Sequence, residues 1–193
     1  YLVVLPFVLM PFTGWLFAIV GKLLKKLRSV PLGVASGEGL LERYLILWFV
    51  VVFGFFSFSG TQLPHYLLYG CTPVFILLAR YRPEFERRWL AYVPLIAFAL
   101  LLAALPEILA FAAGKAGKPF EKTLLDGLVA AFSDEARWLL PLLAVAVIAL
   151  ALWRTLPVWQ GLVIAGLLQA LVVAAVIAPR VIGVTQGPIR EAA

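Results

Sequence analysis

Charged residues are scarce in this chain: Asp, Glu, Lys and Arg make up 13% of its 193 residues, whereas 64% are hydrophobic. The mean hydropathy is +1.03. A soluble domain of this length has too little interior to bury so much apolar surface. The composition therefore excludes a soluble globular domain and predicts an integral membrane protein.

Cysteine and histidine are almost absent, since Cys71 and His65 are the single residues of each kind. One cysteine excludes an intramolecular disulfide and leaves the redox compartment open. A lone histidine is a poor metal site, so no metal centre is predicted from these residues. Two interpretations of His65 stay open: a hydrogen-bonding interface residue, or one ligand of a zinc ion whose other ligands lie elsewhere.

A signal-peptide pattern is also missing, and the chain opens at Tyr1 inside an apolar run. We therefore expect that the start of the natural protein is missing. The net charge of +6 does not call for a nucleic acid partner, because basic residues gather in the cytoplasmic loops of membrane proteins.

Six apolar segments predict an all-α fold, a polytopic transmembrane helix bundle of about six spans over residues 1–178. A helix needs about 20 residues to cross about 30 Å of hydrocarbon, and the first, fourth and sixth segments meet this length. The second and third are shorter, but each connects a charged loop with the same polar turn. The segments cover residues 2–20, 44–58, 66–79, 90–112, 138–153 and 158–178.

The connecting loops alternate between two sides, and the basic residues favour one of them. That side holds the loops 21–43, 80–89 and 153–157. The basic excess is expected to face the cytoplasm, which places the turn 57–65, the loop 114–137 and the tail 179–193 outside. Ten of the sixteen Lys and Arg lie on the first side: Lys22, Lys25, Lys26, Arg28, Arg43, Arg80, Arg82, Arg87, Arg88 and Arg154.

Two loops have the pattern of ordered structure. Apolar residues recur at helical spacing in 119–133, which predicts a short amphipathic helix on the outer surface of the bilayer. In 21–28 leucines alternate with basic residues. This segment is either a juxtamembrane anchor on anionic lipid or a specific substrate site.

The stretch FFSFSGTQLPHYLLYG, residues 55–70, gathers hydrogen-bonding side chains between two apolar segments. Helices of about 15 residues reach only about 22 Å, so we expect the turn between them to lie below the outer membrane surface. Non-helical backbone at that depth must be covered by protein or line a wet cavity. The sequence predicts an outward-facing, substrate-binding pocket floored by Ser57, Ser59, Thr61, Gln62, His65 and Tyr66.

A plainer interpretation of the same turn stays open. Its serines would cap helix ends, and its tyrosines would belong to the interfacial aromatic belt. Three further polar positions have structural interpretations as well. Glu107 is expected to snorkel or cap near the outer end of its segment, and Asp134 and Glu135 suit a helix N-terminus. Gln169 is expected to form an interhelical hydrogen bond.

At this turn the sequence resembles membrane glycosyltransferases that use polyprenyl-phosphate sugars. The nearest subgroup is the aminoarabinose lipid A transferase-like one, related to the protein O-mannosyltransferases. Those relatives usually have lysine where Gln62 stands and often proline where Tyr69 stands. The tail APRVIGVTQGPIREAA resembles the point where such proteins leave their last span for an outer C-terminal domain. The matching positions are Phe56, Ser57, Ser59, Thr61, Leu63, Pro64, Tyr66 and Pro73.

The resemblance implies the C-terminal half of a GT-C fold. It also implies transfer of a sugar from a polyprenyl-phosphate carrier to a lipid or protein acceptor on the outer face of a bacterial inner membrane. The family's key aspartate lies in a first outer loop upstream of this region, so no catalytic residue is assigned here. The need for a divalent metal is left open. Glutamine at position 62 removes a positive charge but can still donate hydrogen bonds to phosphate oxygens.

Two other functions compete with a transferase. A transporter or flippase usually needs ionisable groups near the bilayer midplane, and no such group lies well inside a predicted span. A non-catalytic membrane subunit is the third alternative.

Overall fold

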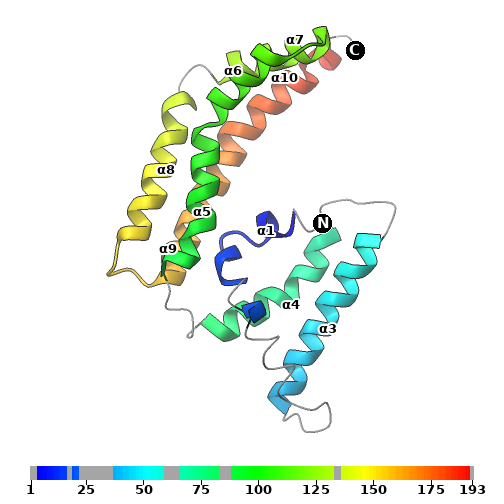
Figure 1. The fold of residues 1–193 in the computed structure, drawn as a ribbon, viewed down its shortest axis with the longest axis vertical. Helices are drawn as coiled ribbons and strands as arrows, with labels where there is room; N and C mark the ends of the chain where they lie inside the picture. The colour runs from blue at the N-terminus through cyan, green and yellow to red at the C-terminus, as the bar shows by residue number, and fades with distance from the viewer. Residues whose placement is uncertain are drawn as a thin grey trace. The chain divides into compact units, whose positions relative to one another are not determined.

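Helices make up nearly all of the described chain in the computed structural model, which describes residues 4–16, 19–21, 37–58, 66–82, 88–132 and 136–191. No strand occurs in these ranges, so the predicted all-helical class is confirmed. Figure 1 shows the helices. Their bounds are α1 Leu5–Val8, α3 Gly37–Phe58, α4 Tyr66–Tyr81, α5 Arg88–Ala103, α6 Leu105–Lys115, α7 Pro119–Ala131, α8 Ala136–Leu152, α9 Val158–Val172, the π-helix η2 Val173–Ile177, and α10 Ala178–Glu191.

Two helical stretches in the described ranges are long and apolar enough to cross a membrane: Gly39–Phe58 and Val158–Gln186. The number rises to four when each of two bent helix pairs, α5 with α6 and α7 with α8, counts as one span. This supports an integral membrane protein. It shows two to four such helices and not a clear set of six.

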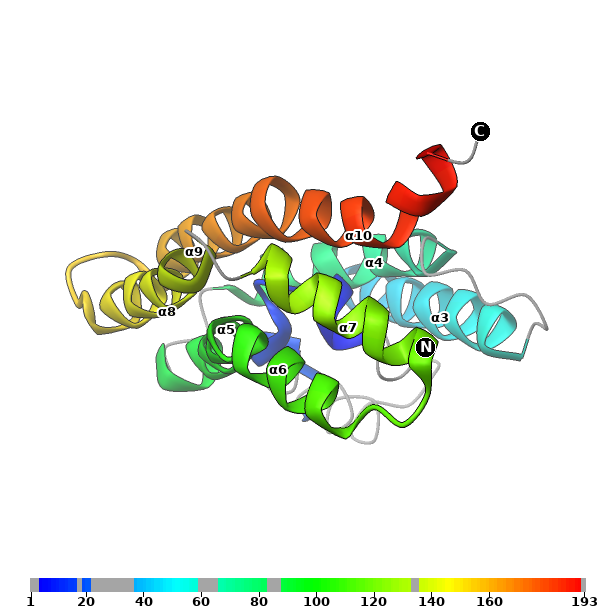
Figure 2. The ribbon, with the colours of Figure 1, turned by 90° about the horizontal axis from the view of Figure 1, so that it is seen from above.

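The chain divides into two compact units, residues 1–92 and 93–193. In the first unit α3 and α4 pack against each other, and α4 also contacts α1. In the second unit α8 packs on α9, and α7 contacts both α6 and α10. Figure 2 shows α7 between α6 and α10.

The first apolar segment does not form one continuous helix. Its described residues form the four-residue helix α1, a turn, and a second helical stretch at 13–16. Pro11 has no N–H to donate to the carbonyl of Phe7, so α1 does not continue through it. Leu9 and Trp15 are nonetheless buried, at 0% and 4% exposure.

The prediction of two undersized helices around the polar turn is wrong for α3. This helix has 22 residues, which corresponds to about 33 Å at 1.5 Å per residue. It begins at Gly37, ahead of the charged pair Glu42 and Arg43. The segment predicted from the sequence starts after Arg43, because Glu42 is expected to lie in the charged loop 21–43. In the structure Glu42 is 4% exposed and paired. The other helix, α4, has 16 residues and is indeed short, at about 24 Å.

The fourth apolar segment is broken at Ala104, where α5 and α6 meet at 53°. Pro106 lies in the first turn of α6. Proline removes one helical hydrogen bond and its ring clashes with the carbonyl four residues earlier. A continuous helix through this position would lose that bond in an apolar environment, so the break follows from the proline.

The helix predicted in the loop 119–133 is confirmed as α7. Glu121, Lys122 and Asp126 are exposed, whereas Leu124 and Leu128 are half-buried. The chain also stays helical beyond Ala178, since α9, η2 and α10 follow one another without a break. The tail predicted at 179–193 therefore starts as a helix that packs on α7.

Candidate functional site

The predicted pocket falls at the junction of α3 and α4. Ser57 lies in the last turn of α3 and is half-buried, and Tyr66 is the first residue of α4. The other predicted pocket residues, Ser59, Thr61, Gln62 and His65, lie outside the described residues. The structure thus places the two ends of the turn but does not test the pocket itself.

Helices α3 and α4 form an antiparallel pair that holds this turn. Gly70 of α4 is buried, and a Cβ placed on it would lie 3.3 Å from Val52 Cγ1. Small residues allow such close helix approach, which packing in membranes depends on. The pair is therefore tightly packed at this contact, which lies nearer to the turn than to the other end of the two helices.

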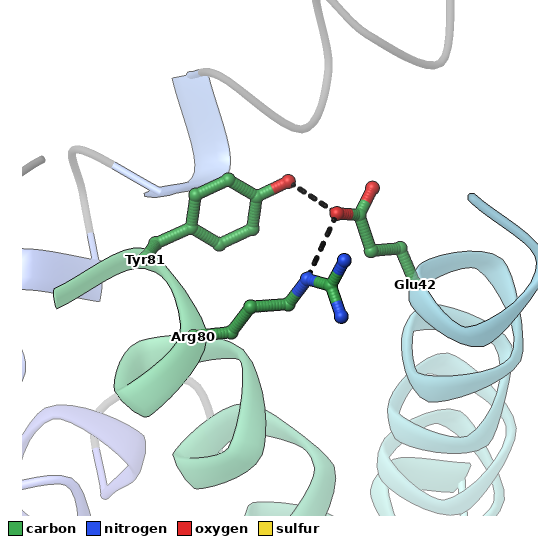
Figure 3. A network of polar contacts seen from close by, with 3 residues as sticks. All are labelled: Glu42, Arg80 and Tyr81. Carbon is green, nitrogen blue, oxygen red and sulfur yellow. Dashed lines mark hydrogen bonds and ion pairs between the residues drawn. The ribbon is translucent and has the colours of Figure 1, made fainter. Parts of the chain in front are cut away.

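A polar cluster closes the other end of this helix pair (Figure 3). Tyr81 donates its hydroxyl hydrogen to Glu42 Oε1 at 2.8 Å, and Arg80 Nε lies 3.4 Å from the same oxygen. The Glu42 side chain retains 6% exposure and the Arg80 side chain 30%. We call these three residues the Glu42 cluster.

The burial and pairing of Glu42 indicate that the cluster has a structural role and specifies how α3 and α4 pair. A buried carboxylate is costly unless it is paired and hydrogen-bonded, and here both requirements are met by α4. The cluster lies fifteen residues along α3 from Ser57, which is about 22 Å. It does not take part in the predicted pocket directly.

The Glu42 cluster is not among the sites predicted from the sequence, because Glu42 is expected there in the charged loop 21–43. One signal in the sequence could have found it. Glu42, Leu45, Phe49 and Val52 follow the alternating three- and four-residue spacing of a helix-packing seam. A charged residue at a position of such a seam is buried against the facing helix and therefore needs a polar or charged partner there.

A buried interhelical hydrogen bond predicted from the sequence is present in the described part of the second unit. Gln169 on α9 is 3% exposed, and its Nε2 donates to the carbonyl of Leu95 on α5 at 2.8 Å. An amide in this position joins two helices in surroundings with little competing water. Gln169 therefore has a packing role.

Two arginines connect further elements of this unit. Arg180 donates from Nε to the carbonyl of Ala131 at 3.1 Å and from Nη1 to that of Val176 at 2.9 Å. It thus links the end of α7 to the π-helix η2. Arg137 forms an exposed ion pair with Glu107 at 2.9 Å. The snorkelling or capping role expected of Glu107 stays a prediction.

Within the described ranges, no group of three or more His, Cys, Asp and Glu side chains could hold a metal ion. His65, Asp134 and Glu135 lie outside those ranges.

Comparison with known proteins gives no match: no protein-family model, no curated protein and no solved structure resembles the chain significantly. Function must therefore be argued from the chain's own residues and from the sequence resemblance at the turn.

Proposed function

We propose that this chain forms part of the membrane region of a glycosyltransferase that takes a sugar from a polyprenyl-phosphate carrier. The observation that carries the proposal is the run of residues from Phe56 to Pro73 that resembles such enzymes. In the fold this run crosses from the end of α3 into α4. An all-helical protein with two to four apolar helices of spanning length supports the same class.

The proposed chemistry is a displacement at the anomeric carbon of the sugar. A bond forms between the acceptor oxygen and this carbon, and the bond from the carbon to the phosphate oxygen breaks. The lipid phosphate leaves with the electron pair, and the acceptor's proton passes to a carboxylate. The resemblance assigns that carboxylate to a part of the enzyme upstream of this region.

The turn supplies hydrogen-bond donors in this proposal. The leaving group is a stabilised phosphate anion, so donors around it matter more than a strong general acid. The hydroxyls of Ser57 and Ser59 and the amide of Gln62 are donors of this kind. The acceptor is a lipid or a protein on the outer face of a bacterial inner membrane, where the turn is proposed to lie.

A transfer assay on the full-length protein in membrane vesicles tests this function. Gln62→Ala and Ser59→Ala should each lower the rate by about 10- to 100-fold, because a hydrogen bond to a charged group contributes about 1.5–3 kcal/mol. Gln62→Lys, which introduces the residue usual in the resembling enzymes, should keep or raise it. Thr72→Ala on exposed α4 surface is the matched control. Unchanged rates in the turn variants would reject the site.

The orientation is tested separately by labelling. Gln62→Cys in a Cys71→Ala background leaves a single thiol within residues 1–193. A membrane-impermeant maleimide added outside intact cells should modify it. Modification only after the cells are opened would place the turn on the cytoplasmic side and contradict the proposal.

A further inference from the structure

The contact face of α3 against α4 follows a regular pattern. Every third or fourth residue of α3 lies on it, whereas Tyr44, Leu47, Val51, Phe55 and Phe58 on the other face are exposed. Alternation of three and four is the spacing of a heptad seam between two helices. The seam positions of α3 are Glu42, Leu45, Phe49, Val52 and Phe56, all buried or half-buried.

Two contacts define the register of this antiparallel seam. One is Glu42 with Arg80, and the other is Val52 with Gly70. The second lies ten residues further along α3 and ten residues back along α4, so both contacts belong to one register. The same register places Leu45 opposite Leu77, and both are buried, at 2% and 4% exposure.

Apolar packing alone specifies this register weakly. Beyond Arg43, α3 presents only apolar seam residues, and α4 is apolar over most of its length. A slip of one heptad that sets Glu42 opposite Pro73, about 10 Å along the axis, would still leave apolar neighbours at the next seam positions. It would set Leu45 against Gly70 and Phe49 against Tyr66. It would also carry Glu42 away from Arg80 and Tyr81, leaving a buried carboxylate without its partners, which is strongly unfavourable.

We propose that the Glu42 cluster is the register-setting layer of the α3–α4 pair and acts as a positioning site for the turn between these helices. A polar residue at one seam position is the best-attested way to fix helix register. The register follows from the described contacts alone. Its consequence for sugar transfer, that it fixes where the donors of residues 57–66 lie, rests on the proposed function.

Disulfide cross-linking in membranes tests the register in the full-length protein, in a Cys71→Ala background. Leu45→Cys with Leu77→Cys reports the observed register. Phe49→Cys with Tyr66→Cys reports the slip of one heptad that would set Glu42 opposite Pro73, because the two Cα atoms are otherwise about 10 Å apart along the axis and a disulfide needs less than about 7 Å. The parent protein should form only the first disulfide.

Replacing the cluster by apolar residues should release the register. In Glu42→Leu/Arg80→Leu, neither register leaves a buried charge, so the Phe49–Tyr66 disulfide should form in amounts comparable with the Leu45–Leu77 disulfide. Tyr44→Leu, on the exposed face, should keep the parent's pattern. The proposal is overturned if the double variant also forms only the Leu45–Leu77 disulfide.

A milder variant keeps the test decisive if the double variant does not reach the membrane. Glu42→Gln removes the charge but retains the side chain's size, and it should yield a smaller but measurable amount of the slipped disulfide. Formation of the first disulfide alone would again overturn the proposal. These cross-linking readouts need no enzyme assay. Failure of the register proposal is therefore distinguishable from failure of the proposed transferase function. If both proposals hold, slipped variants should also transfer sugar more slowly.

Discussion

Gly14 lies against the backbone of α5 in the first unit, and enlarging it is a sharp test of stability. A Cβ on Gly14 would lie 2.8 Å from both Cα and the carbonyl oxygen of Ala91, and closer still to the carbonyl oxygen of Leu90. Pro94 stands four residues after Leu90 and has no N–H to donate to that carbonyl. A side chain at position 14 must therefore displace helix backbone.

The expected cost follows from what has to move. Overpacking a core costs about 1–3 kcal/mol, and the backbone of α5 yields less easily than a side-chain end. We therefore expect Gly14→Ala to lower the free energy of unfolding by about 3 kcal/mol, at the upper end of that range. The measurement is a reversible denaturant titration of the purified protein in detergent micelles.

Two other glycines provide matched controls. No atom lies within 4 Å of a Cβ on Gly54, whereas the nearest atoms to one on Gly70 would be two side-chain atoms of Val52 at 3.3 Å and 3.7 Å and the Phe53 nitrogen at 3.9 Å. Gly54→Ala should stabilise α3 by up to about 1 kcal/mol, because alanine favours helix. Gly70→Ala should fall between the two. If Gly14→Ala is as stable as Gly54→Ala, the inferred close approach is wrong.

Three further predictions concern the second unit. Gln169→Leu should lower the free energy of unfolding by about 1 kcal/mol, the usual size of an interhelical hydrogen bond in a membrane protein, as measured by the same titration; no loss would contradict the bond. Arg180→Gln should speed amide hydrogen exchange at the end of α7 and leave exchange in α8 unchanged. The exposed control Arg154→Gln should change neither. Equal exchange in both variants would refute the link that Arg180 makes between α7 and η2. In a double-mutant cycle on Glu107 and Arg137, both more than half exposed, the coupling energy should be less than about 1 kcal/mol and should decrease with salt. A larger coupling energy that does not depend on salt would contradict the exposed ion pair.

The sequence by itself determined those features that depend on local pattern. Scarcity of charge predicts the membrane class, and helical spacing in 119–133 predicts α7, because side chains three and four positions apart share one helix face whatever the rest of the fold does. The hydrogen-bonding role of Gln169 was also predictable, since an amide in an apolar helix needs a partner. Its partner, Leu95, lies 74 residues away and was not predictable.

Only the tertiary structure decided where α3 begins, and it overturned the sequence prediction there. By local pattern Glu42 belongs to a charged loop that precedes the helix. It is nevertheless buried inside α3, because Tyr81, 39 residues later, donates a hydrogen bond to it and Arg80 lies beside it. The same holds for Gly14, whose closeness to Ala91 depends on packing between distant segments. The period of a helix depends only on neighbouring residues. The free energy of burying a charge, or of having a Cβ at a given position, depends on which distant side chain or backbone lies opposite.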